Sequence, residues 1–106
     1  MPLDPVAATE RLRAFARARA WEQFHTPKNL ATALVVEAGE LAEIFQWATP
    51  EESDPTAWSP ETRARAEDEV ADVAIYLLRF ADVAGIDLGD AVMAKIERNE
   101  ARFPAG

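Results

Sequence analysis

The sequence contains no cysteine, a single histidine and no long apolar run, and each absence excludes a class of protein. Without cysteine the chain can form no disulfide, zinc–thiolate site or thiol nucleophile, and one histidine cannot build a multi-histidine zinc site. The first twenty residues carry acids and four arginines where a signal peptide would have an apolar core. No stretch is long enough to span a bilayer. We therefore expect a cytoplasmic protein with no membrane partner.

Positive charge is also scarce. The 11 lysines and arginines are outnumbered by 19 acids, and the net charge is −8. This balance disfavours binding to a nucleic acid polymer or to an anionic membrane surface. A chain of 106 residues is expected to form one domain, residues 1–106, whose core is small enough that oligomerisation would add stability.

Four helices are predicted, and the first three start with the same signal, a capping side chain followed by proline. The signal occurs at Asp4-Pro5, Thr26-Pro27, Thr49-Pro50 and Ser59-Pro60. It predicts helices over 5–22, 27–47 and 60–84, and a loop with at most one helical turn over 49–58. Gly85 supplies a C-terminal cap to the third helix, and Asp87 can start a fourth over 88–102. With no alternating strand pattern, the fold class predicted is all-α, a four-helix bundle.

Over residues 70–81, the helix predicted over 60–84 has apolar side chains almost all the way round its axis, as buried helices do. Its residues Ile75 and Leu78 lie away from the face that carries its acids. We expect a second subunit to cover them.

Two pairs of carboxylates interrupt apolar helix faces. Glu37 and Glu40 are three residues apart, as are Glu69 and Asp72, so each pair lies on one helical face. Glu37 falls within a stripe of leucines, and Glu69 occupies the corresponding position in the later helix. Acids on a solvated face are common, but such acids lie opposite the leucines. Two buried pairs would repel one another, and a divalent cation is the simplest neutraliser.

Carboxylate ligands without histidine or cysteine favour hard cations, so Mg²⁺ is expected and Mn²⁺ should substitute. Mg²⁺ commonly completes its coordination with water and substrate phosphate, which points to phosphate chemistry. The last predicted helix presents Lys95, Asn99 and Arg102 on one face, where they could bind phosphates. Cations near a helix C-terminus are also favoured by the helix dipole alone.

Aromatic residues provide a candidate site for a base. Trp21, Trp47 and Tyr76 combine an apolar ring with a polar group, which suits stacking on a base and hydrogen bonding to its edge. Aromatic residues at helical spacing often belong simply to the core. His25 could contact a ligand or satisfy a turn.

Four segments together resemble the MazG-like all-α nucleotide pyrophosphohydrolases, and most closely their dCTP pyrophosphatase branch. They are Trp21-Glu22-Gln23-Phe24-His25-Thr26-Pro27-Lys28-Asn29-Leu30, Glu37-Ala38-Gly39-Glu40-Leu41-Ala42-Glu43 through Phe45-Gln46-Trp47, Glu69-x-x-Asp72 with Tyr76-Leu77, and Lys95-Ile96 with Asn99 and Arg102-Phe103-Pro104. The resemblance covers almost the whole chain.

The resemblance implies a role for each group of residues. The ligands of catalytic Mg²⁺ would be Glu37, Glu40, Glu69 and Asp72. The substrate would be bound by Trp21, His25, Trp47, Tyr76, Lys95, Asn99 and Arg102. It also implies a homotetramer or homodimer whose sites can borrow residues across subunits. The chain departs from the branch at Leu12, where the eukaryotic enzymes carry histidine, and at Phe103, where tyrosine is common.

The resulting prediction is a Mg²⁺-dependent hydrolase that splits a deoxynucleoside triphosphate, dCTP above others, into the monophosphate and pyrophosphate. In it, Glu40 or Glu43 would accept a proton from the attacking water. One alternative is the same reaction on a modified or non-cytosine nucleotide. The other is a helical interaction module that binds metal without catalysis.

Overall fold

The computed structural model describes residues 2–106 and is all-α, as predicted. Its α-helices are α1 (Pro5–Ala18), α2 (Pro27–Phe45), α3 (Pro50–Ser53), α4 (Pro60–Ala84) and α5 (Leu88–Arg102). Two short 3₁₀ helices, Glu22–Phe24 and Pro55–Ala57, lie in the connections. Over the described residues there is no strand, and no helix is long and apolar enough to cross a membrane.

The predicted helix starts are all confirmed, and each has the expected cap. The side chains of Asp4, Thr26, Thr49 and Ser59 accept hydrogen bonds from backbone N–H groups in the first turn of α1, α2, α3 and α4. Asp87 caps α5 in the same way. These side chains satisfy backbone donors that have no partner within the helix. The one turn expected after Pro50 is the short helix α3.

Two helices end earlier than predicted. The helix expected over 5–22 stops at Ala18, because Ala20 adopts a left-handed backbone conformation with φ of 56°. The N–H groups of Ala20 and Trp21 then bond back to Arg17 and Ala16, which closes the helix. This position usually belongs to glycine, so the sequence contains no signal for it. The helix expected over 27–47 ends at Phe45.

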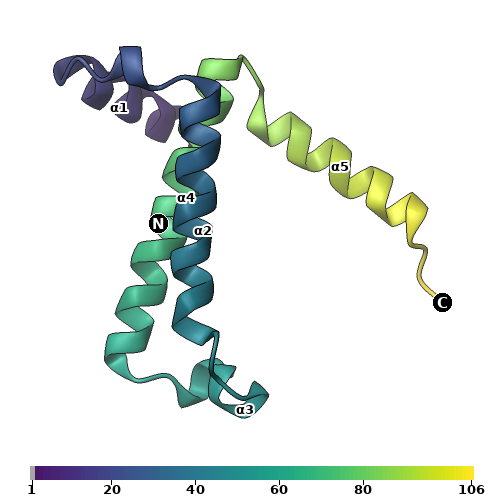
Figure 1. The fold of residues 1–106 in the computed structure, drawn as a ribbon. Coiled ribbons are helices and arrows are strands. Elements are labelled where there is room, and N and C mark those ends of the chain that lie inside the picture. Colours follow the sequence, from purple (N-terminus) through teal and green to yellow (C-terminus); the bar gives the residue numbers. More distant parts are fainter. Residues whose placement is uncertain (1) are drawn as a thin grey trace.

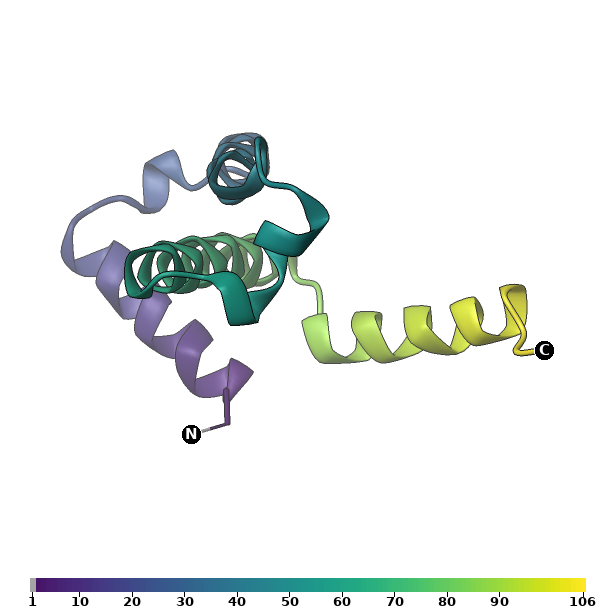
Figure 2. The same cartoon turned by 90° about the horizontal axis from the view of Figure 1, so that it is seen from below.

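The centre of the fold is an antiparallel pair of helices, α2 and α4, which lie side by side along most of their length (Figures 1 and 2). Helix α1 crosses α4 near one end of the pair, and α3 lies at the other end. The buried apolar residues are few, and they come from these three long helices: Ala16, Leu30, Ala66, Leu78 and Ala81.

The prediction that a second subunit covers Leu78 is wrong. Leu78 is 6% exposed within the single chain, because α1 crosses over α4 at this point. Leu78 and residues of α1 line the same cavities. Ile75 remains 40% exposed, so the expectation still applies to that side chain.

Helix α5 extends away from the α2–α4 pair into solvent (Figures 1 and 2). The four long helices of one chain therefore do not close into the predicted bundle. Helix α5 nevertheless has an apolar face, formed by Val92, Met93 and Ile96, and all three side chains are exposed. Such a face gains stability only when another surface covers it.

Candidate functional site

Three of the predicted ligands meet between α2 and α4. Ligand oxygens of Glu37, Glu40 and Glu69 all lie within 4.8 Å of one another, and we call these residues the acidic cluster. Glu37 and Glu69 are half-buried, whereas Glu40 is exposed. The antiparallel packing of α2 against α4 brings the two i, i+3 pairs to the same level. The predicted convergence of carboxylates from two helices is therefore present.

The acidic cluster is electrostatically unfavourable as it stands. Oε2 of Glu37 and Oε2 of Glu69 are both buried and have no hydrogen-bond partner. Burial raises the pKa of Glu37 to about 7, and the neighbouring Glu69 and Glu40 carboxyls add to the rise. Burial also raises the pKa of Glu69. Buried polar atoms without partners are rare in native proteins and call for an explanation.

A divalent cation provides that explanation. Oxygen ligands without nitrogen or sulfur suit hard cations such as Mg²⁺ or Mn²⁺, and the two buried oxygens would become ligands. Asp72 lies one turn after Glu69 on α4, and its charge contributes to the raised pKa of both Glu37 and Glu69. The charge of Asp72 thus acts on the acidic cluster, although Asp72 is not one of the three residues that form it.

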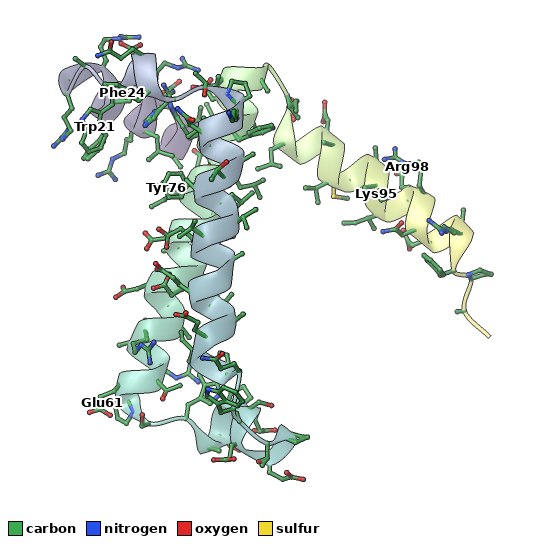
Figure 3. The ribbon with its side chains drawn as sticks, viewed as in Figure 1. Trp21, Phe24, Glu61, Tyr76, Lys95 and Arg98 are labelled. Carbon is green, nitrogen blue, oxygen red and sulfur yellow. The ribbon has the colours of Figure 1, made fainter. Side chains whose placement is uncertain are left out.

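A second predicted group lies nearby. Trp21, His25 and Tyr76 line a cavity of about 140 Å³ together with Leu12, Phe15, Ile75 and Arg79. We call it the aromatic cavity. Figure 3 shows Trp21 and Tyr76 on the same side of the α2–α4 pair, toward α1. Tyr76 follows Asp72 by four residues, or about 6 Å along the axis of α4. The cavity therefore adjoins the carboxylates.

The sequence did not identify Arg79 as part of this cavity. The residue is 7% exposed, which is unusual for arginine. The one signal in the sequence is that Arg79 is a charged residue within the otherwise apolar stretch 73–81 of α4.

The remaining predicted residues lie elsewhere. Trp47 is 88% exposed and follows the C-terminal end of α2, whereas His25 precedes the N-terminal end of the same helix. Lys95, Asn99 and Arg102 are exposed on α5. Figure 3 shows Lys95 on the projecting helix, far from the paired helices. One chain therefore does not bring these four side chains to the acidic cluster or to the aromatic cavity.

Comparison with known proteins identifies the family. The family described as MazG-like matches residues 32–106, which include the whole acidic cluster. The chain belongs to the MazG-like family. Relatives of this MazG-like chain include dCTP pyrophosphatase 1 of Bos taurus, 52% identical over 95 residues, which are 89% of this chain and 56% of that protein. The Homo sapiens protein of the same name is 52% identical over 96 residues, 90% of this chain and 56% of that protein. The chain thus spans about half the length of these curated relatives.

A solved structure shares the fold of the MazG-like chain. It is a pyrophosphatase from Archaeoglobus fulgidus, with a TM-score of 0.83 and 42% sequence identity. The match covers 91% of this chain and 88% of that chain. At this identity and coverage, most of the chain has the fold of that solved structure.

Proposed function

We propose that this protein hydrolyses dCTP between its α and β phosphates and releases dCMP and pyrophosphate. The observation that carries the proposal is the acidic cluster beside the aromatic cavity. The chain that forms them is 52% identical over 95 residues to a protein named dCTP pyrophosphatase 1. The acidic cluster suits the binding of phosphates through a divalent cation, and the aromatic cavity suits the binding of a base.

In the proposed site Glu37 and Glu69 hold Mg²⁺ through their buried oxygens, and Glu40 and Asp72 complete the set of carboxylates. When bound, Mg²⁺ supplies positive charge against the triphosphate and assists the activation of water. The exposed carboxylate of Glu40 is placed to accept a proton from the attacking water, and Glu43 is the alternative.

The aromatic cavity limits the size of the base. A volume of about 140 Å³ is close to that of an engineered cavity of about 150 Å³ that binds benzene. It accommodates one six-membered ring. Trp21 and Tyr76 supply ring surfaces and polar groups around it. We infer a preference for pyrimidine over purine nucleotides.

We infer that the phosphate-binding residues of each site come from another copy of the chain. Lys95, Asn99 and Arg102 lie on a helix that projects away from its own acidic cluster. The exposed apolar face of the same helix favours its packing against a second copy. We propose a homotetramer, or alternatively a homodimer, in which α5 of one subunit serves the site of another.

A modified pyrimidine is a second candidate substrate, and Leu12 favours it. Leu12 lines the aromatic cavity with an apolar side chain. An apolar wall accepts an apolar substituent on the base, such as a methyl group, at little cost.

A screen for pyrophosphate release tests both candidates. Canonical and 5-methylated deoxynucleoside triphosphates are incubated with the protein and Mg²⁺, with Mn²⁺ in parallel and with chelator as the control. We expect dCTP or its methylated form to be turned over fastest, and no turnover with chelator. Binding of Mg²⁺ without turnover of any triphosphate would instead identify a non-catalytic interaction module.

A further inference from the structure

Arg79 of α4 is a buried cation with two partners. Its Nε donates a hydrogen bond of 3.0 Å to Nδ1 of His25, and its Nη1 donates one of 3.0 Å to Oδ2 of Asp82. The Asp82 carboxylate also accepts from the guanidinium of Arg13 on α1. These bonds lower the pKa of Asp82 and keep it charged. The guanidinium of Arg79 is therefore fixed between a carboxylate and an imidazole.

The contact with Arg79 determines the tautomer of His25. A guanidinium N–H can only donate, so Nδ1 of His25 must accept and cannot carry a proton. A neutral imidazole that accepts at Nδ1 carries its proton at Nε2. Burial lowers the pKa of His25, and the charge of Arg79 lowers it further, so the ring is neutral near pH 7. His25 therefore has one donor to offer, its Nε2–H.

The same imidazole is held within the aromatic cavity. His25 and Arg79 both line the cavity. Trp21 stands edge-on to the imidazole, with ring centroids 6.4 Å apart and an interplanar angle of 66°. The orientation of His25 is thus limited by Trp21, and its protonation by Arg79.

We propose that Arg79 is a positioning residue, which holds His25 as the Nε2–H tautomer so that the cavity presents a hydrogen-bond donor to the base. This inference rests on the proposed function, since it places the base of the nucleotide in the aromatic cavity. Cytosine presents two adjacent acceptors, N3 and O2, whereas N3 of thymine carries a proton. A fixed donor directed at N3 is accepted by cytosine, whereas in thymine it meets the N3–H donor.

Magnetic resonance of the imidazole tests the tautomer directly, because His25 is the one histidine in the chain. Long-range ¹H–¹⁵N spectra of the ¹⁵N-labelled protein near neutral pH should show a protonated Nε2 and an unprotonated Nδ1. In Arg79→Met, which keeps an unbranched side chain and removes the guanidinium with its donors, the two nitrogens should shift toward averaged values. Arg13→Met is the matched control, since Arg13 binds the same Asp82 and lies outside the cavity. Its spectrum should match the wild type.

Kinetics then test the effect on the base. Arg79→Met should raise KM for dCTP about tenfold with little change in kcat, and should reduce the preference for dCTP over dTTP. Arg79→Lys, which retains a donor, should restore part of that preference.

A wild-type His25 protonated at Nδ1, or at both nitrogens, would overturn the inference without reference to any variant. So would an unchanged spectrum in a folded Arg79→Met protein. If the wild type shows the expected tautomer but releases pyrophosphate from no triphosphate, the proposed function fails and the role in base binding fails with it. If the protein turns over dCTP but His25 is not the Nε2–H tautomer, the inference about Arg79 is refuted and the proposed function stands.

Discussion

Glu37 of α2 and Glu69 of α4 face one another across the helical pair, and each has one buried carboxylate oxygen without a hydrogen-bond partner. Burial raises the pKa of both groups, and the nearby charges of Glu40 and Asp72 raise it further. An arrangement that is costly in the metal-free protein becomes favourable when a divalent cation is bound.

Replacing Glu37 or Glu69 by glutamine should abolish metal binding and reduce turnover by more than about a hundredfold, because each change keeps the shape and removes a ligand charge. The metal-free variants should melt at a higher temperature than the wild type, since a repulsive charge is removed. Calorimetric titration with Mn²⁺, pyrophosphate release and thermal melting measure the three effects. Glu67→Gln, on the exposed side of α4, is the control. Full turnover by both cluster variants would refute the metal site.

The stability of the metal-free protein should depend on the ionisation of Glu37. Its pKa is about 7 in the folded state, against an ordinary value of 4.5. An acid with a raised folded-state pKa contributes stability that is fully present below about pH 4.5 and is lost as the pH rises to about 7. Melting temperatures of Glu37→Gln and wild type should thus be similar near pH 4.5 and diverge as the pH rises, with the variant higher.

Taking the difference between two proteins removes the contribution of His25. The pKa of His25 is lowered, so its contribution to stability is lost as the pH falls below its ordinary value of 6.5. That effect is common to the variant and the wild type. A melting-temperature difference that stays constant across this pH range would contradict the assignment to Glu37.

Lys95 should act on the site of another subunit. Lys95→Ala is expected to lower kcat/KM about ten- to a hundredfold for every triphosphate, since phosphate contacts do not distinguish bases. Lys95→Ala and Glu37→Gln subunits are then mixed, dissociated and reassembled. The mixture should regain activity, because some sites combine an intact acidic cluster with an intact Lys95. A mixture no more active than its components would show that Lys95 does not serve across subunits.

The exposed apolar face of α5 should be buried in the assembly. Ile96→Asp is expected to dissociate the oligomer while leaving the helical content of each chain unchanged, since Ile96 is 45% exposed within one chain. Sedimentation velocity and circular dichroism measure the two properties. Arg98→Asp introduces the same residue two positions later, on the opposite face of α5 by the helical period, and should preserve the assembly. A wild-type protein that sediments as a monomer at micromolar concentration would end the proposal.

The sequence by itself determined where the helices begin and that acids from two of them meet in a cluster. The capped prolines mark the starts of α1, α2, α3 and α4, and the predicted bounds of α4 and α5 agree with the structure. The helical phase of Glu37 and Glu69 predicted that they would face a common core. These features depend on residues within about four positions of one another, where hydrogen bonds and helical period are local properties.

Only the tertiary structure decided how the helices are placed. The left-handed turn at Ala20 carries no glycine, yet it ends α1 and allows that helix to cross α4 and cover Leu78. The direction of α5, which separates Lys95 from the acidic cluster, is set by the short connection after α4. Arg79 meets a histidine 54 residues away, and Arg13 meets an aspartate 69 residues away. Such contacts depend on the crossing of whole helices, which no local pattern specifies.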